Sequence, residues 1–204
     1  SAASIFAVEA NALATSRVAV GGTGATTGRT VSLTSSALTI DTNFGEVGDS
    51  LVLSASALNI ARSGAFTLSG SSVDLNAVTG IGSPLAPIQT ATATVSAVNA
   101  GPTGSVVIIN AGNLSVSGAN AGGGAFDAAA AGAGRTLTVN AGNINAHAGS
   151  VTLTGDVLAL QGTVTGDGGV MLKPYSTGAV IGVENAAQAF NVTSAMLGQI
   201  TSST

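Results

Sequence analysis

Carboxylates are the residues of this chain best suited to chemistry, because two held close together can act as general acid and general base. Among the nine Asp and Glu residues, Glu46 and Asp49 stand three apart in a Gly-containing stretch that predicts a turn. Asp156 and Asp167 each follow a Thr-Gly pair, which is also typical of a corner. We therefore expect these carboxylates to cap backbone N–H groups, and we assign no catalytic residue.

The remaining candidates for chemistry are a histidine and a glycine-rich segment. His147 is the only histidine, and no nucleophile motif such as Gly-x-Ser-x-Gly lies near it, so we expect an exposed corner histidine. Residues 122–127 (Gly-Gly-Gly-Ala-Phe-Asp) are similar to the calcium-binding nonapeptide Gly-Gly-x-Gly-x-Asp. However, Ala125 takes the place of a glycine and no second copy follows. The chain has no cysteine, and we predict neither a metal site nor a cofactor.

Thr-x-Thr triplets form a third pattern, which resembles the stacked rows of ice-binding solenoids. Such rows match a lattice only when they are evenly spaced, and here the spacing is irregular. Threonine is a common outward residue on a strand, so we interpret the triplets as strand surface. They are Thr90/Thr92/Thr94, Thr136/Thr138, Thr152/Thr154 and Thr163/Thr165.

Composition excludes several classes of protein. Only 7% of the 204 residues are charged, against about 25% in an ordinary soluble domain. The five Lys and Arg residues are scattered and the net charge is −4, which disfavours binding to nucleic acid. A mean hydropathy of +0.53 argues against disorder. Polar or small residues interrupt every apolar run before the roughly 20 residues of a membrane-spanning helix, so we expect no membrane insertion.

The elements that position these residues follow a repeated template: two apolar residues two apart, four small or polar residues, then a second apolar pair. Alternation with period two predicts short strands with one buried face, and the residues between predict corners. The clearest copies are Val107/Ile109 then Leu114/Val116, and Leu137/Val139 then Ile144/Ala146. Further copies are Val31/Leu33 then Leu38/Ile40, Leu51/Leu53 then Leu58/Ile60, Phe66/Leu68 then Val73/Leu75, and Val151/Leu153 then Leu158/Leu160.

The spacing of the copies predicts the fold. A β-sandwich would need tight hairpin turns, and only Asp167-Gly168 offers one. We therefore predict an all-β parallel β-solenoid that forms a single domain over residues 1–204, with roughly eight to ten coils and a length of about 40–50 Å. Equivalent positions are expected to recur from Leu33 to Leu53, Leu53 to Leu68, Val139 to Leu153 and Leu153 to Leu172.

Two stretches interrupt the template and predict loops inserted at corners. Residues 80–104 contain three of the four prolines, and residues 117–134 are rich in Gly and Ala. The second stretch includes four consecutive alanines at 128–131, which could also form a short helix.

The last third of the chain resembles the strand repeats of filamentous-haemagglutinin-like exoproteins and autotransporter-type adhesins of Gram-negative bacteria. Residues 150–162 (SVTLTGDVLALQG) look like their strand-corner-strand unit, and residues 163–172 look like the turn that opens the next coil. Segments 172–175, 180–182, 190–194 and 197–200 are similar to a module of very large members. The resemblance implies a right-handed solenoid that is secreted, displayed at the cell surface, and used for adhesion, aggregation or a biofilm matrix.

Three functions remain open at this point. The chain could be a non-enzymatic stalk segment of an extracellular adhesin or fibre, or a subunit that stacks end to end into a filament. A β-helix enzyme acting on polysaccharide is the third, which the scattered carboxylates disfavour. Apolar residues run close to both termini, so we expect open ends that pair with flanking coils or with other copies, and sides that could face a host or matrix surface. These residues are Ile5, Phe6 and Val8 at one end and Phe190, Val192, Met196 and Ile200 at the other.

Overall fold

The computed structural model describes residues 4–19 and 28–201, which form an all-β parallel solenoid of about seven turns. The first sheet runs β1 (Ile5–Val8), β3 (Thr30–Ser35), β5 (Ser50–Ala55), β8 (Ser72–Ala77), β10 (Thr94–Asn99), β12 (Leu114–Asn120), β14 (Thr136–Asn145), β17 (Val164–Thr165) and β21 (Ile200–Thr201), with β16 (Val157–Leu160) also beside β14. Every ladder between these strands is parallel. Backbone hydrogen bonds therefore run from coil to coil along the solenoid axis.

The opposite side of the solenoid carries two shorter sheets. One contains β2 (Leu13–Ala14), β4 (Leu38–Ile40) and β6 (Ile60–Arg62), and the other β7 (Thr67–Ser69), β9 (Ile88–Ala91), β11 (Val106–Ala111), β13 (Phe126–Ala131), β15 (Val151–Thr154) and β18 (Val170–Lys173). We call this six-stranded sheet the second sheet. The remaining elements are a 3₁₀ turn η1 (Thr15–Arg17), a two-stranded sheet of β19 (Ile181–Val183) and β20 (Phe190–Val192), and α1 (Ser194–Leu197).

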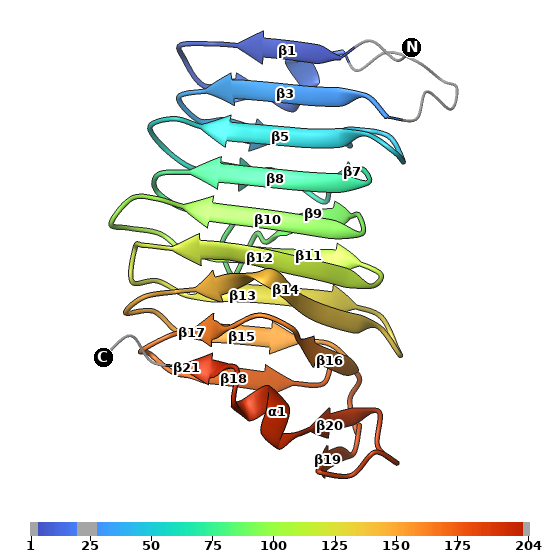
Figure 1. Cartoon of the computed structure of the whole chain (residues 1–204). Coiled ribbons are helices and arrows are strands. Elements are labelled where there is room, and N and C mark those ends of the chain that lie inside the picture. Colours follow the sequence, from blue (N-terminus) through green and yellow to red (C-terminus); the bar gives the residue numbers. More distant parts are fainter. Residues whose placement is uncertain (1–3, 20–27, 202–204) are drawn as a thin grey trace.

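The solenoid is right-handed, as expected. In Figure 1 the first sheet lies in front with its strands running to the left, and the second sheet lies behind with its strands running to the right, while the chain descends from the N-terminal end. Viewed down the axis from that end, the chain turns clockwise as it recedes. This is the hand that nearly all parallel crossovers adopt, because strands twist to the right.

The predicted coil count is wrong, because both sheets of one coil carry the same apolar pattern. Thr30 pairs with Ser50, and Ser50 with Ser72, so one coil takes 20 to 22 residues there. Leu53 pairs with Leu75, not with Leu68, so the shorter spacing of about 15 residues joins two sides of the same coil. About seven turns at roughly 4.8 Å each give a rod of about 35 Å.

The core is a set of apolar columns, one residue per coil. One column contains Val31, Leu51, Val73, Val95, Val116 and Val139, all at most 1% exposed. Alternation along each strand places these residues inside and Ser, Thr or Asn outside, which is why the period-two pattern predicted the strands correctly. Fully burying one such side chain contributes roughly 1.5–3 kcal/mol.

The predicted orientation of β11 is wrong by one residue. Val106, Ile108 and Asn110 point inward, whereas Val107 and Ile109 lie on the outer side of the second sheet. Val107 is nevertheless only 7% exposed, because the loop that contains Pro84 and Pro87 lies beside it. Because the loop shields this outward position from water, an apolar side chain occupies it. The alternation of apolar residues therefore does not show which residues of β11 face the core. Leu58 also departs from the template, since it is 50% exposed before β6.

Neither stretch predicted as an inserted loop lies wholly outside the stack. Within residues 80–104, β9 and β10 continue the two sheets, and residues 80–87, 92–93 and 100–104 lie outside these strands. Within residues 117–134, β12 extends to Asn120 and the alanine run lies in β13, so it is a strand and neither a loop nor a helix. Ala128 and Ala130 face inward and are almost fully buried. Small side chains fit there because Phe126 fills the adjacent core.

Phe126 compensates for small residues across the core. A Cβ on Gly118 would stand 1.9 Å from the carbonyl oxygen of Ala97 and 3.0 Å from Cε2 of Phe126. Only glycine therefore fits at that point of the first sheet, and the aromatic ring from the second sheet occupies the space that larger side chains fill in other coils. Phe126 itself is fully buried.

Two regions differ in regularity. We call residues 28–173 the stack, and residues 174–198 the C-terminal lobe, which lies at the lower end of the molecule in Figure 1 and contains β19, β20 and α1. The lobe covers part of the last coil, since Phe190 and Met196 are 2% and 8% exposed and belong to the core. These two residues are therefore buried and do not form an open apolar end.

Candidate functional site

Two of the four carboxylates considered as catalytic candidates, Asp49 and Asp156, accept hydrogen bonds from backbone N–H groups. Asp49 is fully buried and forms an ion pair with Arg29, with Nε–Oδ1 and Nη2–Oδ2 distances of 3.0 and 2.8 Å. Its Oδ2 also accepts a hydrogen bond from the N–H of Glu46 at 3.1 Å. The expected capping role is therefore confirmed, and the pair fastens the corner before β3 to the corner before β5. The hydrogen bond to Asp49 also raises the pKa of Arg29.

Asp156 also acts as a corner cap. It accepts the N–H of Gly134 and the N–H of Ser176, both at 2.7 Å, and the hydroxyl of Ser176 at 2.5 Å. These bonds join three successive corners, and the Ser176 hydroxyl is the main reason why the pKa of Asp156 lies below its ordinary value. Asp167 lies in its own corner, where its N–H donates to the carbonyl of His147 at 2.8 Å.

Asp41 and Glu184 repeat this arrangement near the two ends, and sequence reasoning did not single them out. Asp41 accepts hydrogen bonds from the hydroxyls of Thr15 and Ser16 and from the Ser16 N–H. Glu184 accepts the N–H and hydroxyl of Ser194, which starts α1. The serine hydroxyl is the largest cause of the lowered pKa in each case. Each is a structural clamp between segments that the sequence places apart.

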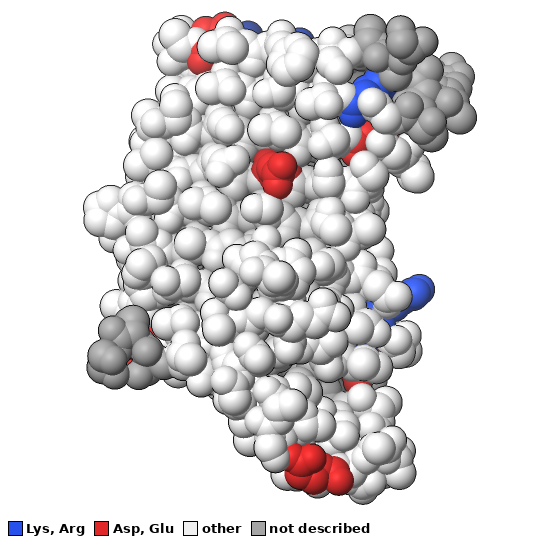
Figure 2. Space-filling model, viewed as in Figure 1, with Lys and Arg blue, Asp and Glu red and all other residues white. Residues whose placement is uncertain are grey.

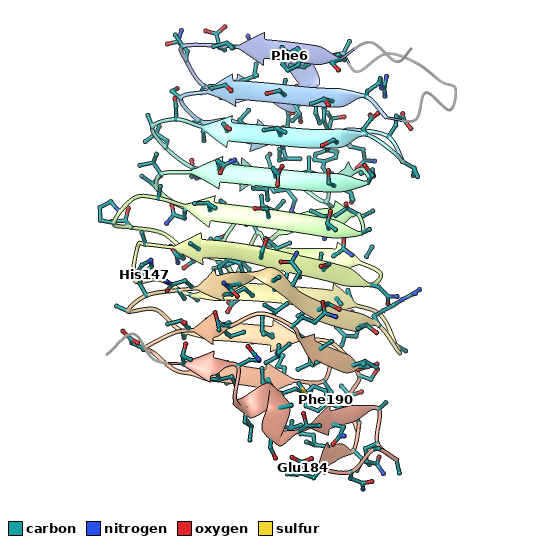
Figure 3. The ribbon with its side chains drawn as sticks, viewed as in Figure 1. Phe6, His147, Glu184 and Phe190 are labelled. Carbon is teal, nitrogen blue, oxygen red and sulfur yellow. The ribbon has the colours of Figure 1, made fainter. Side chains whose placement is uncertain are left out.

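His147 lies at an exposed corner, as predicted, and Figure 3 places it at the left-hand edge of the stack. Its φ of 48° and the 2.9 Å bond from its N–H to Oδ1 of Asn145 are those of a tight turn. In the calcium-like segment, residues 121–125 form a turn and Asp127 points outward from β13. Within residues 4–19 and 28–201, no three His, Asp or Glu side chains gather closely enough to hold a metal ion.

Two asparagines form a buried ladder at the corner after the first sheet. Asn99 and Asn120 are paired in register and fully buried, and the Asn99 amide donates to Oδ1 of Asn120 at 2.8 Å. Asn120 then donates to the carbonyls of Gly104, Gly124 and Ala125. Stacked amides of this kind satisfy the polar backbone of a corner that water does not reach.

The Thr-x-Thr triplets do not form one face. Thr90 points inward from the second sheet and donates to Asn110 in the core, whereas Thr152 and Thr154 lie on the outer side of the same sheet. The aligned hydroxyls form another set, which shares only Thr94 and Thr138 with the triplets. Sequence reasoning missed this set because its members stand one coil apart. They form an outward column on the first sheet: Thr30, Ser50, Ser72, Thr94, Ser115 and Thr138.

The outer side of the first sheet is nearly free of charge. Figure 2 shows this face almost entirely white. Asp74 is the only charged residue at the outward positions of β3, β5, β8, β10 and β12. Such a face presents hydroxyls and small side chains, with little charge to repel a neighbouring surface.

The chain offers no identification through similarity. No helix among residues 4–19 and 28–201 is long and apolar enough to cross a membrane. Comparisons of the chain with protein-family models, with curated proteins and with solved structures find no match.

Proposed function

We propose that this chain is a structural segment of an extracellular bacterial adhesin or surface fibre, acting as a stiff, non-enzymatic rod. The observation that carries the proposal is the direction of the backbone ladders, which run along the rod axis through the nine successive strands from β1 to β21. A pull along the axis would load many parallel hydrogen bonds at once. The family resemblance of residues 150–200 supplies the extracellular and adhesive part of the proposal.

The chemistry of the described surface supports a mechanical role. Asp41, Asp49, Asp156 and Glu184 are engaged in corner clamps, so these four carboxylates are committed to structure. The nearly uncharged face of the first sheet would allow rods to lie side by side. A host or matrix surface could be approached in the same way.

A second candidate is an end-to-end filament, and the terminal strands favour it. Among the described residues, β1 pairs with β3 alone and β18 with β15 alone, so each has one edge without a strand partner. Such edges recruit another strand. In a longer fibre the partner would be a flanking coil of the same chain, and in a filament it would be a second copy.

Electron microscopy of the purified chain at several concentrations tests both candidates. A stalk segment predicts separate particles about 35 Å long at every concentration, whereas the filament predicts rods whose length grows with concentration. Compact particles without an elongated axis would overturn both. The variants Asn76→Lys and Ser96→Lys place charge on the outer side of the first sheet, and they should abolish side-by-side bundling without changing the length of each rod.

A further inference from the structure

The outer side of the second sheet contains a hollow that the rod function does not use. It has a volume of about 290 Å³ and is lined by the loop of residues 83–87 and by outward residues of β11, β13, β15 and β18. Its apolar wall includes Pro84, Pro87 and Ile109, and its polar residues include Asp127, Thr154 and Lys173. The outer face of the second sheet is therefore concave at this point, because the loop of residues 83–87 lies beside it.

The loop that forms one wall is held closely against the sheet. Ser83 and Ala86 exchange two backbone hydrogen bonds of 3.1 Å, and Ala86 also donates to the Ser83 hydroxyl. A Cβ on Gly82, whose φ is +64°, would stand 2.6 Å from the carbonyl oxygen of Val107. Two prolines with fixed φ complete the turn. This wall is therefore already formed before any ligand arrives.

The polar side chains in the hollow have unused hydrogen-bonding capacity. Oδ1 of Asp127 is buried and has no hydrogen-bond partner. Among the hydrogen bonds of the described residues, none engages the side chains of Thr152, Thr154 or Lys173, although Thr154 is only 8% exposed. Buried polar atoms in native proteins are nearly always partnered. A missing donor near Asp127 is what a bound ligand would supply.

We propose that this hollow binds a neutral saccharide of about two sugar units. One carboxylate and one ammonium group leave the hollow without net charge, so the ligand needs both hydroxyl donors and oxygen acceptors. Asp127 and Ala129 lie in register with Thr152 and Thr154, and these with Met171 and Lys173. Asp127 and Lys173 therefore stand about 10 Å apart across the sheet and about 7 Å along it. That span suits two linked rings better than a single amino acid, whose opposite charges lie close together.

Saturation-transfer NMR on the purified chain tests this proposal, with lactose, maltose, cellobiose and diacetylchitobiose as probes. At least one disaccharide should receive saturation and bind the chain. Asp127→Asn keeps the shape of the side chain but removes its charge, and it should weaken binding about tenfold. The matched control Asp74→Asn changes an outward carboxylate on the other sheet, and it should leave binding unchanged.

Three results would overturn the saccharide proposal. One is the absence of saturation transfer to all four disaccharides from folded protein. Another is equal weakening by Asp127→Asn and Asp74→Asn, which would place binding elsewhere. The third is transfer to a triglycine probe but to no disaccharide, which would make the ligand a peptide. Particle length in the microscope does not depend on this hollow, so failure here and failure of the rod function are distinguishable.

Discussion

The stack and the C-terminal lobe are held together by different interactions. In the stack, the strands of the first sheet from β3 to β14 are paired on both sides, and their inward residues form continuous apolar columns. The lobe contains a two-stranded sheet and a single helical turn. Asp156 of the stack binds Ser176 at the start of the lobe, and Glu184 binds Ser194 within it. Five large apolar side chains stay exposed within it: Tyr175, Val180, Ile181, Val183 and Leu197. Repeated strand pairing and apolar columns stabilise the stack, whereas the lobe depends on a few polar clamps and on two buried apolar side chains, Phe190 and Met196.

The largest effect is expected from opening a cavity in the stack. Phe126→Ala removes a fully buried ring that Gly118 and Ala97 cannot replace, and it should lower the free energy of unfolding by about 3–5 kcal/mol. Urea denaturation followed by circular dichroism measures this loss. Phe6, labelled on β1 in Figure 3, is 72% exposed, so Phe6→Ala should change stability by less than about 0.5 kcal/mol. Similar losses for the two variants would contradict the core described for the stack.

A smaller loss is expected from breaking the asparagine ladder. Asn120→Ala removes one acceptor of the Asn99 amide, which keeps its bond to the Thr103 carbonyl, and removes the side-chain donor to the carbonyls of Gly104 and Gly124. This loss should lower the free energy of unfolding by about 1–3 kcal/mol. The same urea titration applies, with Asn76→Ala as the exposed control on the first sheet. A loss as small as that of the control would mean that water replaces the ladder.

Removing the clamp at Asp156 should loosen the lobe more than the stack. Asp156→Ala deletes the acceptor of three hydrogen bonds, two of them from Ser176 at the start of the lobe and one from Gly134 in the stack. Limited proteolysis should then cut residues 174–198 faster, while the urea midpoint of the stack falls by less than in Asn120→Ala. Asp74→Ala is the control, since that carboxylate lies on the outer face of β8. A fall in the midpoint of the stack equal to that of Asn120→Ala would contradict the separation of the two regions.

Acid should loosen the lobe before the stack. The pKa values of Asp156 and Glu184 lie below their ordinary values of 3.8 and 4.5 in the folded protein. Their stabilising contribution is therefore complete above those ordinary values and is lost as the pH falls through the lower folded values. Tyr175 is the only tyrosine, and the chain has no tryptophan, so its fluorescence reports on the lobe. The fluorescence should change at a higher pH than the circular dichroism of the strands, and coincident transitions would contradict this.

The strands were predictable from sequence, but the assignment of each strand to a coil was not. Alternating apolar residues such as Val31 and Leu33 mark the inward face of most strands in the stack. The same alternation on both sides of a coil hides which strands pair, and Leu53 was matched with Leu68 instead of Leu75. A loop that covers Val107 reverses the apparent orientation of β11. Local pattern specifies strands, whereas register depends on contacts one coil away.

The clamps were only half predictable for the same reason. A carboxylate in a corner predicts capping, as Asp49 and Asp156 show. Their partners Arg29 and Ser176 each lie 20 residues away, which is one coil. Without the coil length, no local motif links these residues. The hollow beside Asp127 was also invisible in sequence, because it joins a proline loop to four later strands.

Hydrogen exchange measured by mass spectrometry across the whole chain tests the central claim most directly. If the stack is one continuous parallel ladder, the amides of β5, β8, β10, β12 and β14 should exchange slowly and together, at the rate of global unfolding. Residues 174–198 should exchange earlier, through local opening. Fast exchange in any of these five interior strands, with the lobe equally or better protected, would contradict the account.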